Sequence, residues 1–341
     1  MKKMIIYGTR PDCIKLAPLM NLLKDDCIVV NTGQHAELPT DVLQHFNIQD
    51  TYNLKLMTHN QSLESFVAKG LVDLTQIIKN EAPGIVIVQG DTSTAMIGAL
   101  AASYNQSKIA HVEAGMRTYR KFSPFPEEIN RTIIDSLVDY AFCPDQKATE
   151  NITNRHAQAY ITGNTSSDAL FSMAKISLVS PYSFPYVLVT SHRRESHGEP
   201  LDRIVKALLV LADIISEKIV FIVHPNPNVQ RAALSLRHDN IILKTPLSYS
   251  EMIAHIDHAS LVITDSGGLQ EEAPALNKRV VYLRNETELP QLASWVTLVG
   301  TDEKRIIDVV RGHLRDKSIP LPLIYDTITP SMKIAEILKS L

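Results

Sequence analysis

The chain has 341 residues, of which 45% are apolar and 21% are charged. Single hydrophobic cores stop growing at roughly 250–300 residues, so this length predicts two domains. The formal net charge of −3 argues against a binder of nucleic acid or of anionic membranes. Since no run of about 18 uncharged apolar residues is present and the N-terminus does not resemble a signal peptide, we expect a cytoplasmic protein without membrane insertion.

Short β-branched runs alternate with longer helical segments in the first half of the chain. This alternation is typical of βαβ units, which form parallel sheets. Two of the predicted helical segments are Leu63–Asn80 and Thr92–Tyr104. The predicted strands are Met4–Tyr7, Cys27–Asn31, Ile85–Gln89, Ile109–Glu113, Tyr140–Cys143 and Ala159–Thr162.

A second series of strands follows a Ser- and Pro-rich segment, Ser177–Pro185, which has the composition of a linker. We therefore predict an α/β fold of two doubly wound domains, residues 1–170 and 171–330. The apolar stripe of Ser331–Leu341 predicts a final helix that can pack on either domain. The strands of the second series are predicted at Tyr186–Thr190, Ile219–Val223, Ile241–Lys244, Leu261–Thr264 and Val280–Leu283.

In open α/β sheets, ligands bind beyond the carboxyl ends of the strands, and two facing domains create a cleft there. After the first strand, Arg10 and Lys15 lie about one turn apart at the start of a predicted helix. Free backbone amides and two cations favour an anion at this position, although an ordinary turn with surface cations has the same pattern. Neither GxGxxG nor GxxxxGK[ST] is present, which argues against dinucleotide and P-loop binding.

Four acidic residues of the first domain stand at the end of a strand or at the start of a helix. Asp91 follows the third predicted strand and is also a natural N-cap. Glu113 ends an apolar strand, where a carboxylate is costly to bury without a partner or a task. Glu127 and Glu128 open a helix after a Pro-rich loop, and Glu128 can pair with Arg131. Together these acids predict a carboxylate cluster suited to acid–base catalysis.

Polar and cationic residues follow the first two strands of the second domain. His192 precedes two arginines in a loop that can hold phosphate oxygens. His224 follows the next strand and is equally compatible with a structural histidine.

The most specific local motif, Asp265–Ala273, follows the strand Leu261–Thr264. Ser266, Gly267 and Gly268 allow backbone amides at a helix start to approach a diphosphate, and Glu272 can accept from ribose hydroxyls. This combination indicates a sugar nucleotide.

The cysteines and the remaining histidines give weaker signals. Cys13, Cys27 and Cys143 form no CxxC pair, so we expect small buried or half-buried thiols rather than disulfides or a zinc site. His255 and His258 stand three residues apart on a predicted helix without a neighbouring Cys or paired carboxylate. We therefore predict no metal site.

Eight ordered motifs across residues 8–273 resemble the non-hydrolysing UDP-N-acetylglucosamine 2-epimerases. The resemblance implies two Rossmann-like domains facing a cleft in the glycosyltransferase B arrangement, with the C-terminal helix 331–341 packing back on the first domain. It also implies a homodimer that needs neither cofactor nor metal. The motifs are GTRPDCIKLAPL, GDTST, HVEAGMRT, SPFPEEINR, TGNTSSDAL, SHRRES, HPNPNV and DSGGLQEEA.

The activity implied by this resemblance is the reversible conversion of UDP-N-acetylglucosamine to UDP-N-acetylmannosamine. UDP would leave as the C2 proton is removed, giving a 2-acetamidoglucal, and would then add back. The positions that match the family's catalytic residues are Asp91, Glu113, Glu127 and His192. Those that match its substrate-binding residues are Arg10, Lys15, His224, Ser266, Gly267, Gly268 and Glu272.

Several positions depart from the family pattern. Ala36 and Asn60 stand where regulated relatives carry Arg, which argues against a second, activating UDP-sugar site. Met252 replaces an aromatic residue near the uracil, which would weaken stacking. Glu288–Gln291 lacks an Arg and a second Glu of the pattern, so substituents on the sugar can differ.

Four alternatives therefore stay open on sequence grounds. A hydrolysing 2-epimerase would release UDP and N-acetylmannosamine, and a related epimerase would act on a UDP-2,3-diacetamido uronic acid. A glycosyltransferase of the same fold would need no C2 proton transfer. A non-catalytic sensor would bind UDP-N-acetylglucosamine without isotope exchange.

Overall fold

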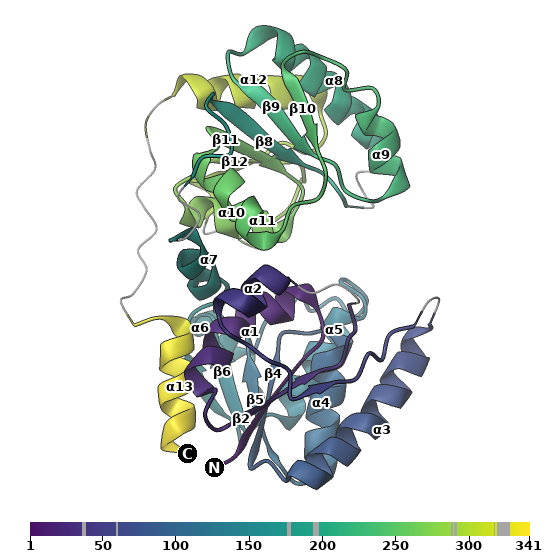
Figure 1. The fold of residues 1–341 in the computed structure, drawn as a ribbon, viewed down its shortest axis with the longest axis vertical. Helices are drawn as coiled ribbons and strands as arrows, with labels where there is room; N and C mark the ends of the chain where they lie inside the picture. The colour runs from purple at the N-terminus through teal and green to yellow at the C-terminus, as the bar shows by residue number, and fades with distance from the viewer. Residues whose placement is uncertain are drawn as a thin grey trace. The chain divides into compact units, whose positions relative to one another are not determined.

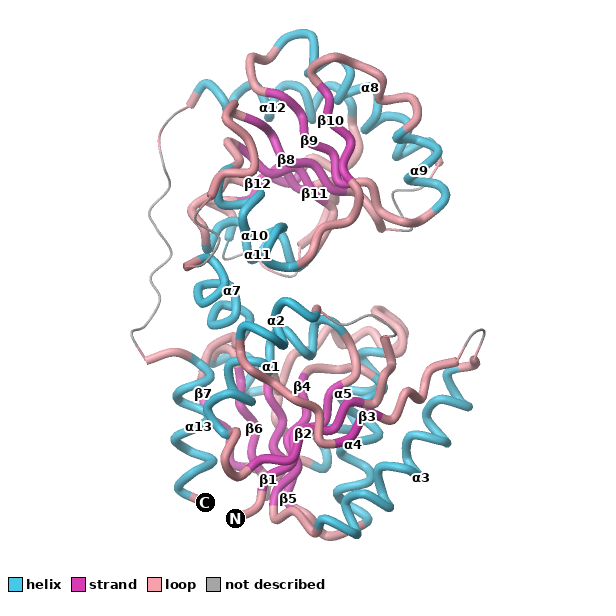
Figure 2. Tube along the Cα trace, viewed as in Figure 1, coloured by secondary structure: helices cyan, strands magenta, loops and turns pink. Residues whose placement is uncertain are grey.

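The computed structural model describes residues 1–35, 39–58, 61–175, 179–193, 198–287, 289, 292–316, 318 and 328–341. The chain divides into two compact units (Figure 1): unit 1 is Met1–Ala169 with Asp326–Leu341, and unit 2 is Leu170–Tyr325. Each unit contains a parallel sheet with helices on its faces (Figure 2). The prediction of an α/β fold with two parallel-sheet domains is therefore confirmed.

Within the described residues, the sheet of unit 1 has seven parallel strands in the order β3-β2-β1-β4-β5-β6-β7. They are β1 (Lys3–Tyr7), β2 (Cys27–Asn31), β3 (Tyr52–Asn53), β4 (Ile85–Gln89), β5 (Lys108–Val112), β6 (Tyr140–Cys143) and β7 (Gln158–Ile161). The helices are α1 (Arg10–Leu23), α2 (Thr40–His45), α3 (Leu63–Glu81), α4 (Ser93–Tyr104), α5 (Glu127–Leu137), α6 (Gln146–Glu150) and α13 (Pro330–Ser340), while α7 (Ser166–Ala174) contains the division between the units.

Both faces of this sheet are covered, which is why its strands are continuously apolar. Met4 and Ile6 of β1 belong to the core with α3 and α4. The alternate residues, Ile5 and Tyr7, belong to a second core with α1 and the C-terminal α13. Helix α13 thus packs in unit 1, beside α1 (Figure 1).

The sheet of unit 2 repeats the same topology with six parallel strands among the described residues, in the order β10-β9-β8-β11-β12-β13. Alternate strand residues such as Val187 and Phe221 pack with α8 and α12 on one face. The strands are β8 (Tyr186–Thr190), β9 (Lys218–Ile222), β10 (Ile241–Lys244), β11 (Leu261–Thr264), β12 (Val280–Tyr282) and β13 (Val296–Leu298). The helices are α8 (Glu199–Ile214), α9 (Pro227–Ala233), α10 (Tyr249–His258), α11 (Gly267–Ala275) and α12 (Glu303–Arg315).

In both sheets the order of strands reverses beside the first strand, between β1 and β4 in unit 1 and between β8 and β11 in unit 2. Ligands of open α/β sheets bind outside the carboxyl ends of the strands at such a reversal. The loops that follow these four strands are therefore the first places to look for a site.

The predicted strands agree with the structure to within about one residue at each end, but two short strands, β3 and β13, were not predicted. Cys13 and Cys143 are buried and Cys27 is half-buried, all as free thiols, which confirms that prediction. Among the described residues, no helix is both long and apolar enough to cross a membrane. The positions Ala36 and Asn60, and most of 288–291, lie outside the described residues.

Candidate active site

The turn after β1 is built by a capping box. Thr9 caps α1, because its side chain accepts from the backbone N–H of Asp12 while the Asp12 carboxylate accepts from the backbone N–H of Thr9 at 3.2 Å. Asp12 also accepts from the Thr92 hydroxyl at 3.2 Å, which ties this turn to the one after β4. Burial raises the pKa of Asp12 to about 6, even though these hydrogen bonds act to lower it. Arg10 is the half-exposed first residue of the helix.

Glu113 is the first residue after β5, and its carboxylate is compensated by two donors. Its Oε2 lies 2.5 Å from Lys15 Nζ and 2.5 Å from Gln89 Nε2. Burial acts to raise the pKa of Glu113, but the Lys15 ammonium and the Gln89 hydrogen bond hold it below its usual range. The backbone of Glu113 has φ 65°, a conformation that costs on the order of 1–3 kcal/mol for a non-glycine residue. The surrounding structure therefore fixes where this carboxylate lies.

Asp91 follows β4 and is paired with Arg131 of α5. The prediction that Asp91 is an N-cap is wrong: Thr92 caps α4, with its side chain accepting from the backbone N–H of Ala95. The Asp91 carboxylate is thereby left to interact with the guanidinium. Asn130 holds the same turn by donating from Nδ2 to the Asp91 carbonyl at 2.8 Å.

The two acids that open α5 have different surroundings. Glu128 is 4% exposed, accepts from the backbone N–H groups of Thr118 and Tyr119 at 3.0 Å each, and lies 3.3 Å from Arg131 Nη1. Its predicted pairing with Arg131 is confirmed, and its position is structural. Glu127 differs, because its Oε2 is buried without a hydrogen-bond partner among the described residues.

Arg131 connects the three acids of unit 1. It pairs with Asp91 and contributes to lowering the pKa of Glu113. Glu127 precedes it by four residues on α5, so both side chains project from the same face of the helix. The carboxylates predicted from separate motifs are thus gathered near one cation, with Lys15 as a second.

In unit 2, the loop after β8 is held by Asp265, which follows β11 and is fully buried. Asp265 accepts from Ser191 Oγ at 2.9 Å and from the backbone N–H groups of His192 and Arg193 at 3.0–3.1 Å. It also lies 3.3 Å from His192 Nδ1. One buried carboxylate therefore sets both the backbone and the ring of His192.

His192 stacks on His224, which follows β9, with ring centroids 5.4 Å apart and an interplanar angle of 23°. Burial lowers the pKa of His192, and the neighbouring His224 and Arg193 lower it further, against the opposing effect of Asp265. The ring of His192 is therefore neutral near pH 7, with a half-exposed side chain that is able to exchange a proton.

The loop after β11 leads into the N-terminus of α11, where Ser266 is the cap residue and its side chain makes no capping hydrogen bond. Gly267 is half-exposed and Gly268 is exposed, and a Cβ added to either would meet nothing closer than 3.5 Å, so there is open space beside the first turn of the helix. Such a helix start attracts anions. Glu272, one turn further, accepts from Tyr249 Oη at 3.0 Å through Oε1.

Among the described residues, an ion pair joins Lys15 to Glu113 and another joins Arg131 to Asp91 in unit 1, and ring stacking joins His192 to His224 in unit 2. Arg10 and Glu127 also belong to unit 1, and the remaining predicted residues belong to unit 2. Sequence reasoning did not single out Gln89 and Asp265, which position Glu113 and His192. Gln89 stands just before the turn that contains Asp91, and Asp265 begins the motif Asp265–Ala273. Their location beside predicted site residues was the signal that could have found them.

The family model described as UDP-N-acetylglucosamine 2-epimerase matches residues 22–339 of the chain. The chain is 41% identical over 338 residues to the UDP-N-acetylglucosamine 2-epimerase of Campylobacter jejuni, covering 90% of this chain and 88% of the relative. It is 38% identical over 339 residues to the enzyme of that name from Bacillus subtilis, covering 93% and 88%.

Solved structures agree with these matches. The crystal structure of UDP-GlcNAc 2-epimerase from Neisseria meningitidis bound to UDP-GlcNAc has a TM-score of 0.88 and 32% identity, covering 100% of both chains. The Methanocaldococcus jannaschii UDP-GlcNAc 2-epimerase in complex with UDP-GlcNAc and UDP has a TM-score of 0.83 and 30% identity, again covering both chains fully. The chain therefore belongs to the UDP-N-acetylglucosamine 2-epimerase family.

Proposed function

We propose that the protein interconverts UDP-N-acetylglucosamine and UDP-N-acetylmannosamine by eliminating UDP and adding it back. The observation that carries this proposal is the group of buried or half-buried carboxylates around Arg131 in unit 1, in a chain of this family. A protein that only binds or transfers the sugar nucleotide has no use for several compensated carboxylates beyond the strand ends.

The chemistry explains why such a cluster is needed. The C2–H of an N-acetyl sugar is a very weak acid, so its direct removal as a proton would be slow. Breaking the C1–O bond to UDP while the C2 proton leaves avoids a full carbanion and gives a 2-acetamidoglucal. UDP then adds back at C1, and a proton is delivered to the opposite face of C2. Both steps require acid–base groups, which typically contribute about 10²–10⁴-fold each.

In this mechanism Asp91, Glu113 and Glu127 transfer the proton. Lys15 favours the charged form of Glu113, Asp91 is paired with Arg131, and Glu127 has neither contact among the described residues, so the three acids are not equivalent. We assign the substrate hydrogen to Oε2 of Glu127, which is buried and has no hydrogen-bond partner among the described residues. Lys15 acts through Glu113, since its ammonium is bonded to that carboxylate.

The residues of unit 2 bind UDP and receive it as the leaving group. The amides of Gly267 and Gly268, with Ser266, take the diphosphate, and Glu272 takes the ribose hydroxyls. His192, stacked on His224, stabilises the phosphate that departs. Keeping UDP bound holds it at a high effective concentration for the return step, which favours re-addition over loss of the glucal to water.

We further propose that the protein works as a cytoplasmic homodimer without added cofactor or metal. The charge compensation of the carboxylates by Lys15 and Arg131 supports a site in which the protein itself supplies the cations. Sedimentation of the purified protein tests the dimer, and unchanged turnover after treatment with a chelator tests the absence of a metal requirement.

The test of the proposed function is to start from either sugar nucleotide and follow the mixture by NMR. UDP-N-acetylglucosamine and UDP-N-acetylmannosamine should reach the same final ratio, with no free sugar. Accumulation of free UDP and N-acetylmannosamine would instead identify a hydrolysing enzyme. No change in either nucleotide sugar would contradict epimerisation, and activity confined to a UDP-2,3-diacetamido uronic acid would reassign the substrate.

A further inference from the structure

The loops that carry the proposed carboxylates are held by a buried aspartate–histidine pair to which none of the roles above has been assigned. Asp135 of α5 and His111 of β5 have side chains that are 3% and 1% exposed, and Asp135 Oδ1 lies 2.6 Å from His111 Nδ1. We propose that Asp135 and His111 are positioning residues that hold Asp91, Glu113 and Glu127 in their working geometry. This inference rests on the proposed function.

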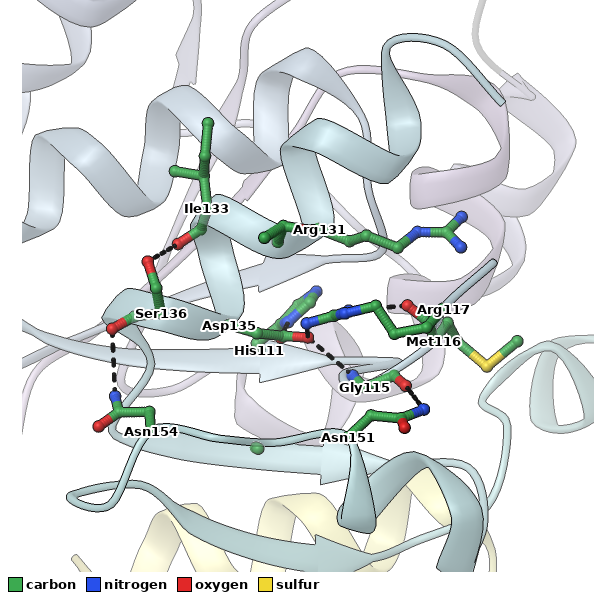
Figure 3. Close-up of polar contacts among 12 residues, drawn as sticks. His111, Gly115, Met116, Arg117, Arg131, Ile133, Asp135, Ser136, Asn151 and Asn154 are labelled. Atoms are coloured by element: carbon green, nitrogen blue, oxygen red, sulfur yellow. Dashed lines mark hydrogen bonds and ion pairs between the residues drawn. The ribbon is translucent and has the colours of Figure 1, made fainter. Parts of the chain in front are cut away.

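The first contact of this pair is with the turn that contains Glu113 (Figure 3). Asp135 Oδ2 accepts from the backbone N–H of Gly115 at 3.1 Å and lies 2.6 Å from Arg117 Nη2. Gly115 has φ 78°, and a Cβ there would lie 2.0 Å from the Ala148 carbonyl oxygen. The turn is therefore fixed on both sides, by Asp135 and by the close approach of the neighbouring backbone.

The second contact is with the turn that contains Asp91. His111 Nε2 lies 2.7 Å from the carbonyl oxygen of Gly90, the residue before Asp91. The Gly90 carbonyl oxygen can only accept, so the ring donates to it through Nε2, while Nδ1 faces the Asp135 carboxylate. Burial acts to raise the pKa of Asp135, but the charges of His111 and Arg117 hold it below its usual range.

The third connection runs through α5 itself. Glu127, Arg131 and Asp135 follow one another at intervals of four residues, so all three project from one face of the helix. Anchoring Asp135 at the end of this face fixes the rotation of the helix, and with it Arg131 on Asp91 and the free oxygen of Glu127. One buried carboxylate thus sets the positions of all three proposed catalytic acids.

Stability alone does not account for this arrangement. A buried ion pair is weak evidence for stability, because well-packed apolar residues of similar volume often serve as well. What an apolar pair cannot do is bind the Gly90 carbonyl and the Gly115 amide together, which are on the turns of two neighbouring strands. The Asp135–His111 pair is therefore explained by the positions in which it holds these two turns.

The test compares Asp135→Asn and His111→Gln with the wild type in the epimerase reaction. Asn keeps the shape of the side chain but removes the charge, and Gln keeps an amide donor but no ring. A displacement of about 1 Å can cost about 10²-fold in rate, so we expect kcat to fall by about that factor. KM and the Kd of UDP should stay within about threefold, as for a loss confined to the transition state.

Asp168→Asn is the matched control. Asp168 is also buried, at 8% exposure, and its Oδ2 accepts a backbone N–H from Ser331 at 2.6 Å. The change should destabilise unit 1, measured by thermal unfolding, but leave kcat within about twofold of the wild type, because distant sites act independently. A loss of kcat in this control equal to that of Asp135→Asn would mean that a general loss of stability explains both, and would overturn the positioning role.

The double variant, Asp135→Asn with His111→Gln, decides whether the two residues act as one unit. We expect its kcat to be no lower than that of the more damaged single variant, since residues acting together are non-additive. Fully multiplicative losses, or kcat within about threefold of the wild type in both single variants, would overturn the proposal. If Asp135→Asn fails to fold, the kcat of His111→Gln alone decides, judged by the same thresholds. An inactive wild type would instead refute the proposed function.

Discussion

Each unit holds the loop after its first strand with a buried aspartate, but the two units present different groups around that loop. In unit 1, Asp12 accepts from the backbone N–H of Thr9, and in unit 2, Asp265 accepts from those of His192 and Arg193. The groups that unit 1 then presents are carboxylates paired with cations. Unit 2 presents the amides of a helix start and stacked imidazoles.

The comparison shows how the same fold, present twice in one chain, carries different chemical groups in its two copies. Carboxylates with adjacent cations exchange protons, whereas amides at a helix start bind an anion without exchanging one. Substitutions in unit 1 should therefore change kcat, and substitutions in unit 2 should change mainly the affinity for UDP.

The largest effect is expected from the acids of unit 1. Asp91→Asn, Glu113→Gln and Glu127→Gln should each lower kcat by about 10²–10⁴-fold, because each removes an acid–base group. The Kd of UDP, measured by calorimetry, should change little. Glu150→Gln, at an exposed acid on α6 of the same unit, is the control and should match the wild type. Undiminished turnover in all three variants would break the comparison and favour a glycosyltransferase.

The second-largest effect concerns the free energy of unfolding and compares two carboxylates of unit 1. Asp12 is buried and accepts hydrogen bonds, whereas Glu113 is paired with a cation. Burial raises the pKa of Asp12 from 3.8 to about 6, so the folded state binds this proton more tightly than the unfolded state. Protonated Asp12 therefore stabilises the folded state below about pH 4, and this contribution to the free energy of unfolding is lost as the pH rises to about 6.

Urea unfolding of the wild type and of Asp12→Asn at several pH values measures this contribution. The wild-type free energy of unfolding, relative to that of the variant, should fall by up to about 3 kcal/mol between pH 4 and pH 6. Above about pH 6 the difference should be constant. A difference that is constant over the whole range would show that Asp12 titrates normally.

In unit 2, Asp265→Asn should weaken UDP binding by about tenfold or more, since hydrogen bonds to a charged group contribute about 1.5–3 kcal/mol each. The change disturbs the backbone of the loop that carries His192, which we place on the departing phosphate. Titration of UDP followed by calorimetry checks the prediction. An unchanged Kd with a large fall in kcat would place Asp265 with the unit 1 residues in function.

The smallest effect is expected for Glu272→Gln, which keeps an acceptor for Tyr249 but removes the charge. We expect UDP binding to weaken by up to about tenfold through weaker ribose hydrogen bonds. For 2′,3′-dideoxy-UDP, wild type and variant should have the same affinity. If the variant weakens both ligands equally, Glu272 acts on another part of the nucleotide.

The sequence was enough for the fold because strongly apolar strands alternate with amphipathic helices. It was not enough for β3 and β13, since strands of two and three residues carry no measurable periodicity. It also misjudged Asp91, because two neighbouring residues were both suited to capping α4, and the tertiary position of Arg131 decides which side chain is left over.

The positioning residues were harder still to predict. Gln89 and Asp265 stand beside turns that the sequence singles out, but no local pattern indicates which groups Gln89, Asp135 and Asp265 contact. Their roles depend on contacts 24, 20 and 73 residues away in the chain, respectively to Glu113, Gly115 and His192. Long-range contacts of this kind are fixed by sheet order and helix placement, which only the three-dimensional structure supplies.

The central claim is that unit 1 moves the C2 proton of a UDP-sugar that stays bound through UDP. The most direct measurement is NMR of UDP-N-acetylglucosamine incubated with the protein in D₂O. The mechanism predicts deuterium at C2 of both UDP-sugars without release of free sugar, and a large reduction of this exchange in Glu113→Gln. Epimerisation without incorporation of solvent deuterium, or saturable binding without any exchange, would contradict it.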